Sequence, residues 1–380
     1  MLAVDLMTQF AERTGLSSGR APQRYLWTDA FAVCNFLGLA RATGESRYTE
    51  LATSLVDQVH HVLGRHRSDD ARRGWISGLA AADGEAHPTL GGLRIGKPEP
   101  ERAPHEPLVE RLEWDRDGQY FHYLTKWMHA LDQVARATGQ VSYVAQACEL
   151  ADTAHRRFAY GPAGRRRMHW KMSIDLARPL VASMGHHDPL DGYLTFRALE
   201  ATRRQLAARG PDLSEAIADL RAMIDVHALA TTDPLGLGGL LVDAYRLAQL
   251  GGDRPLHDAI IAAADRGLQY HASSPERHYP AHHRLAFREL GLSIGLAAAS
   301  EPDAAPRFAR HAALRTEIEA FWSDPGNRQS STWLDHLNIN EVMLATSVLP
   351  EGFLVRRPIT PPPGRGLDGP GAAGPAPTRG

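Results

Sequence analysis

A repeated pattern of helix, glycine and helix constrains the fold of this chain more than any other feature. The segments LARATGESRYTELATSLVDQV (39–59) and VARATGQVSYVAQACELADTA (134–154) share the sequence ARATG, and both carry a tyrosine four residues after the glycine. The same order recurs more loosely in 206–224 and 247–267. In each segment an apolar helix ends at a glycine, a short turn follows, and a second helix begins near a polar residue. The repeating unit is therefore a helical hairpin.

Six such hairpins can be placed along the chain. The first helices are predicted over 24–43, 118–138, 191–207, 235–250, 282–299 and 332–348. Their second helices are predicted over 46–65, 141–158, 213–228, 255–271 and 305–322. The sixth partner is the N-terminal segment 2–15, in which Leu2, Leu6 and Phe10 recur about once per turn. This helix would pair with the last first helix and close the ring.

The two sets of helices differ in polarity. The first helices are apolar on nearly all sides, as in LWTDAFAVCNFLGLA, which is typical of buried helices. The second helices carry a charged face, which is typical of helices on the outside, and strand signals are sparse. We therefore predict an all-α fold, a closed (α/α)6 barrel of six inner and six outer helices, as a single domain over 1–355. The Pro/Gly-rich segment 356–380 is predicted to be a disordered tail.

This arrangement resembles the six-hairpin, or (α/α)6 toroid, superfamily, which includes glycoside hydrolases and sugar 2-epimerases. The resemblance covers residues 2–350 and rests on the number of hairpins and on the polar motifs at the starts of the inner helices. The segment KWMHAL (126–131) is similar to the Trp-x-His segment of N-acylglucosamine and cellobiose 2-epimerases. The resemblance implies a carbohydrate site in the central funnel of the barrel.

The composition argues against several other classes of protein. A formal net charge of −2 supplies no broad positive field for nucleic acid or anionic lipid. No segment has the eighteen or so consecutive apolar residues of a membrane span, and the N-terminus lacks the basic start of a secretory signal. Cys34 and Cys148 lie in apolar helical patterns and are expected to be buried thiols. We therefore expect a cytoplasmic protein.

No cofactor and no metal ion are expected. GLGG (236–239) lacks the Gly-Lys-Ser/Thr ending of a phosphate loop and follows no strand, and no histidine spacing matches a known zinc motif. The expected partner is a small carbohydrate, and the oligomeric state is left open.

Polar side chains collect where the inner helices begin. Gln119, His122, Lys126 and His129 are spaced to share one face of an otherwise apolar helix, next to Tyr123. This stripe either lines an interior cavity or consists of structural histidines and a lysine that reaches solvent. The last inner helix repeats the pattern with Trp333, His336 and Asn340, whose buried polar groups would need water or sugar hydroxyls as partners.

Two further segments add candidates. Arg284, Arg288 and Glu289 belong to the fifth inner helix, where an external ion-pair stripe is the alternative to a pocket role. In GHHDPLDG (185–192), capping and turn formation account for Asp191 and Pro189. They do not account for His186, His187 and Asp188, which we expect at the rim of the funnel. The long connection 66–117 is expected to form a lid or a wall of the pocket.

These candidates support three hypotheses. A glycosidase-like hydrolase of a small intracellular glycoside needs two carboxyl groups, for which Asp188 and Asp29 are the acid/base candidates. A sugar epimerase or isomerase would instead use histidines, with His122 and His187 among the candidates. A non-catalytic protein that binds sugar or peptide is the third. The residues predicted to hold substrate are Trp27, Gln119, Tyr123, Lys126, Arg284, Glu289, His336 and Asn340.

Overall fold

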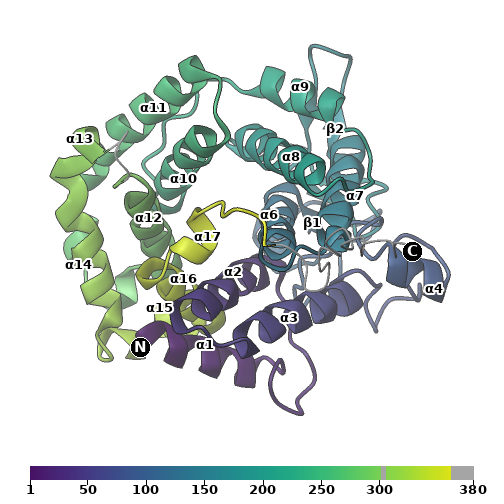
Figure 1. Ribbon diagram of the computed structural model, residues 1–380, viewed down its shortest axis with the longest axis horizontal. Helices are drawn as coiled ribbons and strands as arrows, with labels where there is room; N and C mark the ends of the chain where they lie inside the picture. The colour runs from purple at the N-terminus through teal and green to yellow at the C-terminus, as the bar shows by residue number, and fades with distance from the viewer. Residues whose placement is uncertain (301–304, 361–380) are drawn as a thin grey trace, which may run out of the picture.

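Two concentric rings of α-helices form the computed structural model, which describes residues 1–300 and 305–360 (Figure 1). The inner ring consists of α2 (Leu26–Thr43), α6 (Phe121–Thr138), α8 (Asp188–Gln205), α10 (Pro234–Leu250), α12 (Ala286–Ala298) and α16 (Leu337–Val348). The outer ring consists of α3 (Arg47–Leu63), α7 (Val141–Phe158), α9 (Ser214–Met223), α11 (Arg254–Ala272), α14 (Ala312–Ser323) and α1 (Leu2–Arg13). In the described part of the chain, no helix is both long and apolar enough to cross a membrane.

Contacts between neighbouring helices close the ring. Each inner helix packs against the inner helix before it and the one after it, and α16 packs against α2. Each inner helix also contacts its own outer helix, and α1 fills the outer position beside α16 (Figure 1). The predicted barrel of six inner and six outer helices is therefore confirmed, including the N-terminal helix that closes it.

The shared ARATG sequence ends two neighbouring inner helices in the same way. Gly44 and Gly139 take the left-handed conformation after α2 and α6, with φ of 74° and 70°. In each case a threonine one residue earlier donates its hydroxyl to a carbonyl one turn back, at 2.8 Å. The glycine stops the helix because a β-carbon disfavours this backbone conformation.

The GLGG segment has a packing role. A β-carbon at Gly238 would collide with the carbonyl of Gly291, and one at Gly295 would collide with the backbone of Gly238. These glycines let α10 and α12 approach until their backbones touch. The sequence therefore serves helix packing and not a phosphate loop.

Several predicted boundaries shift in the structure. The inner helix expected over 282–299 begins only at Ala286, after a 3-10 turn at Ala281–His283. The helix expected over 332–348 divides into α15 (Ser331–Leu334) and α16, because the Asn340 amide donates to the carbonyls of Thr332 and Trp333. The outer helix expected over 305–322 divides into α13 (Ala305–Phe308), a 3-10 turn at Ala309–His311 and α14. Two further 3-10 turns span Pro275–His278 and Asn327–Gln329.

Short strands and two small helices occupy the connections around α6 and α7. Strands β1 (Gln119–Tyr120), β4 (Lys171–Met172) and β5 (Pro179–Val181) form an antiparallel sheet in the order β1-β4-β5. Strands β2 (Ala159–Tyr160) and β3 (Arg167–Met168) form a separate hairpin. The 66–117 connection contains α4 (Ala81–Ala86) and α5 (Glu110–Glu113), and its middle part packs on α7 through bonds such as Thr89 Oγ1 to the Gln146 carbonyl.

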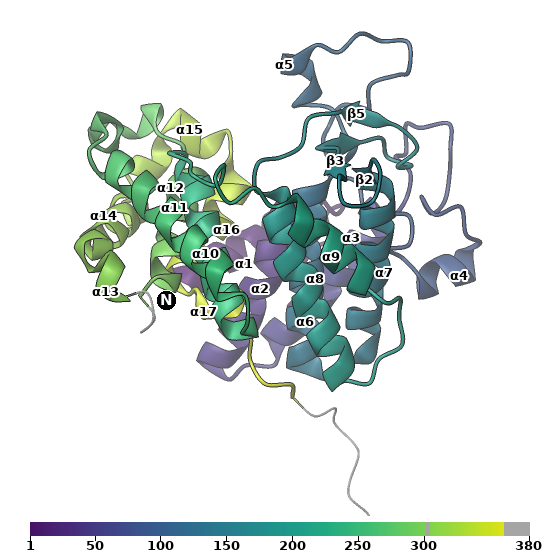
Figure 2. The same cartoon turned by 90° about the horizontal axis from the view of Figure 1, so that it is seen from above.

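The two ends of the barrel are built differently. The short helix α17 (Glu351–Leu354) lies at the end where the inner helices finish, and the β4–β5 hairpin and α5 lie at the other end (Figure 2). Phe353 on α17 stacks on Phe31 with ring centroids 4.4 Å apart. Its carbonyl oxygen lies 2.8 Å from Nε2 of His129. The helix α17 therefore plugs one end of the barrel, and the end where the inner helices begin stays open.

The first residues of the predicted tail are ordered against this closed end. The backbone N–H of Arg356 donates to Gln249 at 2.7 Å, and that of Thr360 donates to the Arg136 carbonyl at 2.8 Å. Residues 356–360 therefore belong to the barrel, because they satisfy polar groups at the ends of α6 and α10. The rest of the predicted tail, 361–380, lies outside the described residues.

Candidate active site

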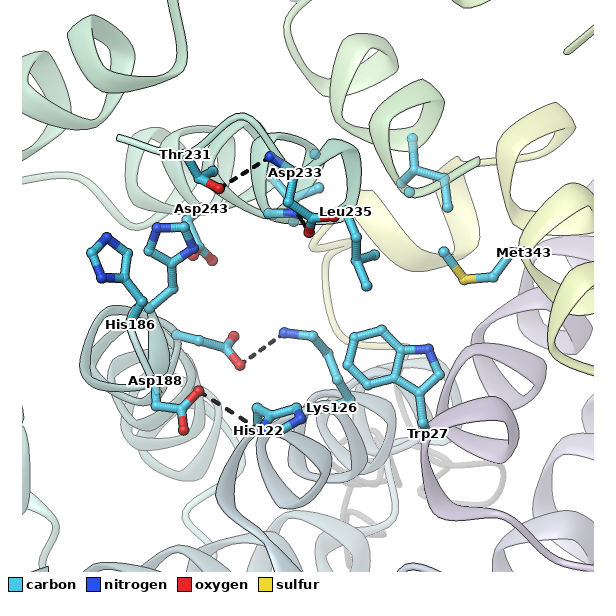
Figure 3. A pocket seen from close by; sticks show the side chains of 18 of the residues that line it. Trp27, His122, Lys126, His186, Asp188, Thr231, Asp233, Leu235, Asp243 and Met343 are labelled. Carbon is cyan, nitrogen blue, oxygen red and sulfur yellow. Dashed lines mark hydrogen bonds and ion pairs between the residues drawn. The ribbon is translucent and has the colours of Figure 1, made fainter. Parts of the chain in front are cut away.

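A cavity of about 540 Å³ opens where the inner helices begin (Figure 3). Phe353 is one of the residues that line it. Five of the predicted site residues line it, together with His186 of the GHHDPLDG segment. They are Trp27, His122, Lys126, His187 and Asp188, and the other polar lining residues are Asp191, Thr231, Asp233 and Asp243. None of the lining residues comes from the 66–117 connection, so this connection does not form a wall of the cavity.

Asp191 is the most heavily bonded carboxylate of the cavity. Its Oδ2 accepts from the Lys126 ammonium at 2.8 Å and from the Thr125 hydroxyl. Its Oδ1 accepts from the Arg246 guanidinium at 3.0 Å. Burial alone would raise the pKa of Asp191, but the charges of Lys126 and Arg246 together with these hydrogen bonds hold it below its usual range. Asp191 is therefore a fixed negative charge that orients two cations.

Asp243 lies one turn before Arg246 on α10 and behaves in the opposite way. Its nearest charged contact is the same guanidinium, 3.6 Å from Oδ1. Burial first, and then the negative charge of Asp191, raise the pKa of Asp243 to about 7. The cavity therefore holds one carboxylate that stays ionised beside one carboxyl group that keeps its proton near neutral pH.

Asp188 and His122 face each other from the first turns of α8 and α6 (Figure 3). Oδ1 of Asp188 lies 3.7 Å from Nδ1 of His122, which is longer than a hydrogen bond. Within the described chain, Oδ2 of Asp188 and Nδ1 of His122 are buried without any hydrogen-bond partner. Buried polar atoms are normally satisfied, so these two atoms are available to a ligand.

The other histidine of the predicted pair is oriented by the backbone. Nε2 of His187 lies 2.9 Å from the Leu229 carbonyl oxygen, so this nitrogen carries the proton and Nδ1 is left as an acceptor. Burial lowers the pKa of His187, which favours the neutral ring. Asp233 caps α10 by accepting from the Gly236 N–H at 2.9 Å, so its position is explained by the helix end.

Asp29, predicted as a catalytic acid, lies outside the cavity lining. Its carboxylate accepts from the Tyr25 N–H at 2.9 Å and pairs with Arg24 at 3.3 Å, which ties down the start of α2. Burial raises the pKa of Asp29 to about 6 even though Arg24 opposes that shift. Asp29 is therefore a buried acid whose carboxylate is used at the start of α2.

Gln119 and Tyr123, two of the predicted binding residues, are bonded to other groups of the protein. Gln119 accepts from the Leu93 N–H at 2.8 Å and donates to the Ile174 carbonyl, so it fastens two connections to the barrel. Tyr123 shares a hydroxyl contact of 2.6 Å with Tyr25 and does not line the cavity.

Polar candidates on α12 and α16 have protein partners as well. Arg284 pairs with Glu289 at 2.7 Å, and the Trp322 indole donates to the same carboxylate at 2.7 Å. His336 sits at the start of α16 with its ring against Phe287, and Asn340 holds the turn between α15 and α16. These four predicted residues stabilise the contacts around α12, α14 and α16 and lie outside the cavity lining.

Sequence reasoning missed Asp243 and Arg246 and misread Asp191. His187, and not Asp191, occupies the N-cap of α8, so the Asp191 side chain is free to point inward. Asp243 and Arg246 stand one turn apart in LLVDAYRLAQL, an otherwise apolar inner helix. A charged pair in a helix buried on all sides is the signal that would have identified them.

In residues 1–300 and 305–360, no three His, Cys, Asp or Glu side chains gather in a group that could hold a metal ion. Asp191, Asp233 and His187 are instead bonded to a cation or to backbone groups.

Comparisons with known proteins identify the fold. The sequence matches no family model and no curated protein. The GH76 α-mannanase of Bacteroides thetaiotaomicron superposes with a TM-score of 0.54 at 10% identity, over 92% of this chain and 95% of that one. Cellobiose 2-epimerases from Bacillus thermoamylovorans (TM-score 0.49, 8% identity, 86% and 88% covered) and Spirochaeta thermophila (0.47, 14%, 86% and 87%) also match. The chain has the (α/α)6 toroid fold, as the hairpin count predicted.

Proposed function

We propose that this protein is a carbohydrate-active enzyme that hydrolyses a small glycoside in the central cavity. One observation carries the proposal: the same cavity contains a carboxyl group that keeps its proton near neutral pH, Asp243, and a carboxylate with an unpartnered oxygen, Asp188. Glycoside cleavage needs such a pair, one to protonate the leaving oxygen and one to act at the sugar carbon. The cavity volume of about 540 Å³ suits a small ligand.

The two carboxyl groups have different roles in this reaction. Asp243 gives its proton to the glycosidic oxygen as the bond from that oxygen to the sugar carbon breaks. Asp188 uses Oδ2 either to take a proton from the attacking water or to attack the sugar carbon itself. Asp191 acts on neither atom, because its oxygens are occupied by Lys126, Thr125 and Arg246. Its charge adds to the effect of burial in raising the pKa of Asp243, so we regard Asp191 as a positioning residue.

Trp27 and Lys126 are the proposed contacts to the sugar. The indole N–H of Trp27 is buried without a partner in the described structure, and its ring lines the cavity. The Lys126 ammonium lies 5.9 Å from the centre of that ring and uses one donor on Asp191. A sugar lying on the Trp27 ring would place hydroxyl groups within reach of both donors.

Epimerisation of a free sugar is the second candidate, and the His122–Asp188 pair favours it. A histidine beside a carboxylate is a suitable base for a proton next to a carbonyl group. His187, whose neutral ring is favoured by burial, lines the same cavity and would provide the second base. A protein that only binds sugar is the third hypothesis and needs neither pair.

Proton NMR in D2O separates these reactions in one experiment. Purified protein is incubated with a panel of small glycosides and free aldoses, alongside the Asp219→Asn variant, whose carboxylate pairs with His155 outside the cavity. We expect new anomeric signals from a glycoside with both proteins. Exchange of the H2 signal of a free aldose would establish epimerisation instead. Binding without any change in the spectra would overturn both enzymatic proposals.

Azide rescue tests the role of Asp188. In Asp188→Ala the missing carboxylate leaves room for a small anion next to the sugar carbon. If Asp188 acts at that carbon, turnover lost in this variant should return with azide and yield a glycosyl azide. The matched variant Asp243→Ala should show no rescue on substrates whose leaving group needs protonation. Full activity of Asp188→Ala without azide would remove the assignment.

A further inference from the structure

A row of aromatic rings continues from the cavity to the protein surface. His122 lines the cavity, and the Trp170 ring lies parallel to it with centroids 6.1 Å apart. Trp114 meets Trp170 edge-on at 5.2 Å, with 77° between the ring planes. Trp114 is 49% exposed, which is unusual for a tryptophan that already has an aromatic partner. Two ring contacts therefore connect the cavity with an exposed indole.

The exposed indole belongs to a projecting segment that we call the arm, residues 101–117. Figure 2 shows its helix α5 beyond the ends of α6 and α8, on the open side of the barrel. The arm contains a second hollow of about 200 Å³. Its lining combines apolar and charged side chains, namely Glu106, Pro107, Val109, Leu112, Glu113 and Arg116. A hollow with both kinds of group has the character of a ligand site, and Trp114 directly follows its lining residue Glu113 in the sequence.

The arm is anchored to the barrel. The fully buried Lys171 ammonium donates to the backbone carbonyls of Glu113 and Arg116, at 2.7 and 2.8 Å, and to the Glu113 carboxylate at 2.9 Å. Arg102 pairs with the other oxygen of that carboxylate at 3.0 Å. These bonds bracket Trp114 on both sides in the sequence. The exposed ring is therefore held in a fixed place, which lowers the entropy cost of binding to it.

We propose that Trp114, Trp170 and the hollow of the arm form an outer saccharide-binding site, so that the substrate is an oligosaccharide with one end in the cavity. The assignment of the cavity end rests on the proposed function. A sugar ring offers an apolar face to an aromatic side chain and hydroxyl groups to charged ones, and the arm provides both. A purely apolar protein partner would leave the ion pair of Glu106 and Arg116 buried at the contact without a role.

Binding measurements test the outer site without requiring turnover. Isothermal titration with glucose, cellobiose and longer cello-oligosaccharides, and with a parallel manno-oligosaccharide series, gives the dissociation constant against chain length. We expect wild-type protein to bind the longer sugars more tightly than the monosaccharide. Trp114→Ala should weaken binding of the longer sugars by about tenfold and leave the monosaccharide unchanged. Trp114→Phe, which keeps a ring, should recover most of the loss.

Controls separate this proposal from the function of the cavity. Tyr270→Ala removes an aromatic ring that is 72% exposed on α11, and it should leave every dissociation constant unchanged. A length preference that survives Trp114→Ala would overturn the outer site even if hydrolysis is observed. The absence of any length preference in either series would do the same. Self-association that disappears in Trp114→Ala without any effect on sugar binding would identify the arm as a protein contact instead.

Discussion

The two ends of helix α6 carry the same kinds of side chain in different surroundings. His122 and Lys126 lie toward its start, and His129 and Gln133 follow on the same side toward its end. His122 Nδ1 has no hydrogen-bond partner in the described chain, and the His122 side chain lines the cavity. His129 and Gln133 instead bond to the carbonyls of Phe353 and Gly352, at 2.8 and 3.1 Å. The two ends differ because α17, from the C-terminal part of the chain, packs against the second half of α6.

This difference separates the inner polar residues that are bonded within the fold from those that can contact a ligand. At the closed end, α17 presents backbone carbonyls to the histidine and glutamine of α6, so their hydrogen-bonding capacity is used in folding. At the open end nothing in the described chain takes that role. Unpartnered groups, including Oδ2 of Asp188, remain beside a solvent-accessible cavity. We infer that stability is concentrated at one end of the barrel and chemistry at the other.

The largest expected effect on stability concerns Arg246, which contacts two aspartates of the cavity. Arg246 is buried between Asp191 and Asp243, and Arg246→Met would leave Lys126 as the only cation beside Asp191. We expect a loss of about 3–5 kcal/mol in the free energy of unfolding, because the buried Asp191 carboxylate loses one of its two cations and the donor to its Oδ1. Urea unfolding at neutral pH measures it. Arg156→Met, which removes an exposed ion pair on α7, is the control and should unfold with the wild type.

Truncating each histidine of α6 should separate the two ends directly. His129→Ala removes the 2.8 Å contact to the Phe353 carbonyl and leaves it only the longer bond from Gln133 at 3.4 Å, so we expect a loss of about 1–3 kcal/mol in the free energy of unfolding and little change in turnover. His122→Ala should show the reverse, with unfolding nearly unchanged and turnover reduced by about tenfold or more. Equal effects of the two variants on stability would contradict the distinction.

The pH dependence of folding stability also tests the difference between the two ends of α6. Burial lowers the pKa of His129 to about 3, whereas the unfolded chain takes up a proton near 6.5. The unfolded state therefore binds more protons between these values, and folding stability falls as the pH is lowered through them. His129→Gln should reduce this slope by about 1.4 kcal/mol per pH unit. Buried His60 has a similar shift and continues to contribute, so some slope should remain in the variant.

A smaller effect concerns the pH dependence of turnover. A general acid must hold its proton, and the pKa of Asp243 is raised to about 7. We therefore expect kcat/KM to fall as the pH rises above about 7. A profile that is flat to well above pH 8 would exclude Asp243 as the acid.

The sequence predicted the architecture more fully than the site, for a physical reason. The helical hairpins are encoded locally, in apolar periodicity and in glycines such as Gly44 and Gly139 that end helices. The environment of a polar side chain depends on contacts that are distant in the sequence. His129 and Phe353 are 224 residues apart, and Lys126 and Asp191 are 65 apart. No local pattern shows that one histidine of the α6 stripe is bonded by α17 and the other is free.

The two aspartates with raised pKa values illustrate the same limit. Asp29 and Asp243 are both buried acids near an arginine in an inner helix. Asp29 was selected because it stands in an apolar motif at a helix start, which is where its backbone partner Tyr25 holds it. Asp243 lies in the second half of the chain, in the middle of α10, and was overlooked. Which of them faces the cavity follows from the tertiary packing of α10 against α8 and α12.

The most direct test of this account compares Asp243→Asn with Asp29→Asn. Both substitutions remove one buried acid of raised pKa, and turnover and Tm are measured for each on the same glycoside. We predict that Asp243→Asn lowers kcat by about 10²- to 10⁴-fold with little change in Tm. Asp29→Asn should lower Tm, because Arg24 loses its partner, and should keep wild-type turnover. The opposite outcome, with turnover lost only in Asp29→Asn, would contradict the placement of the active site in the cavity.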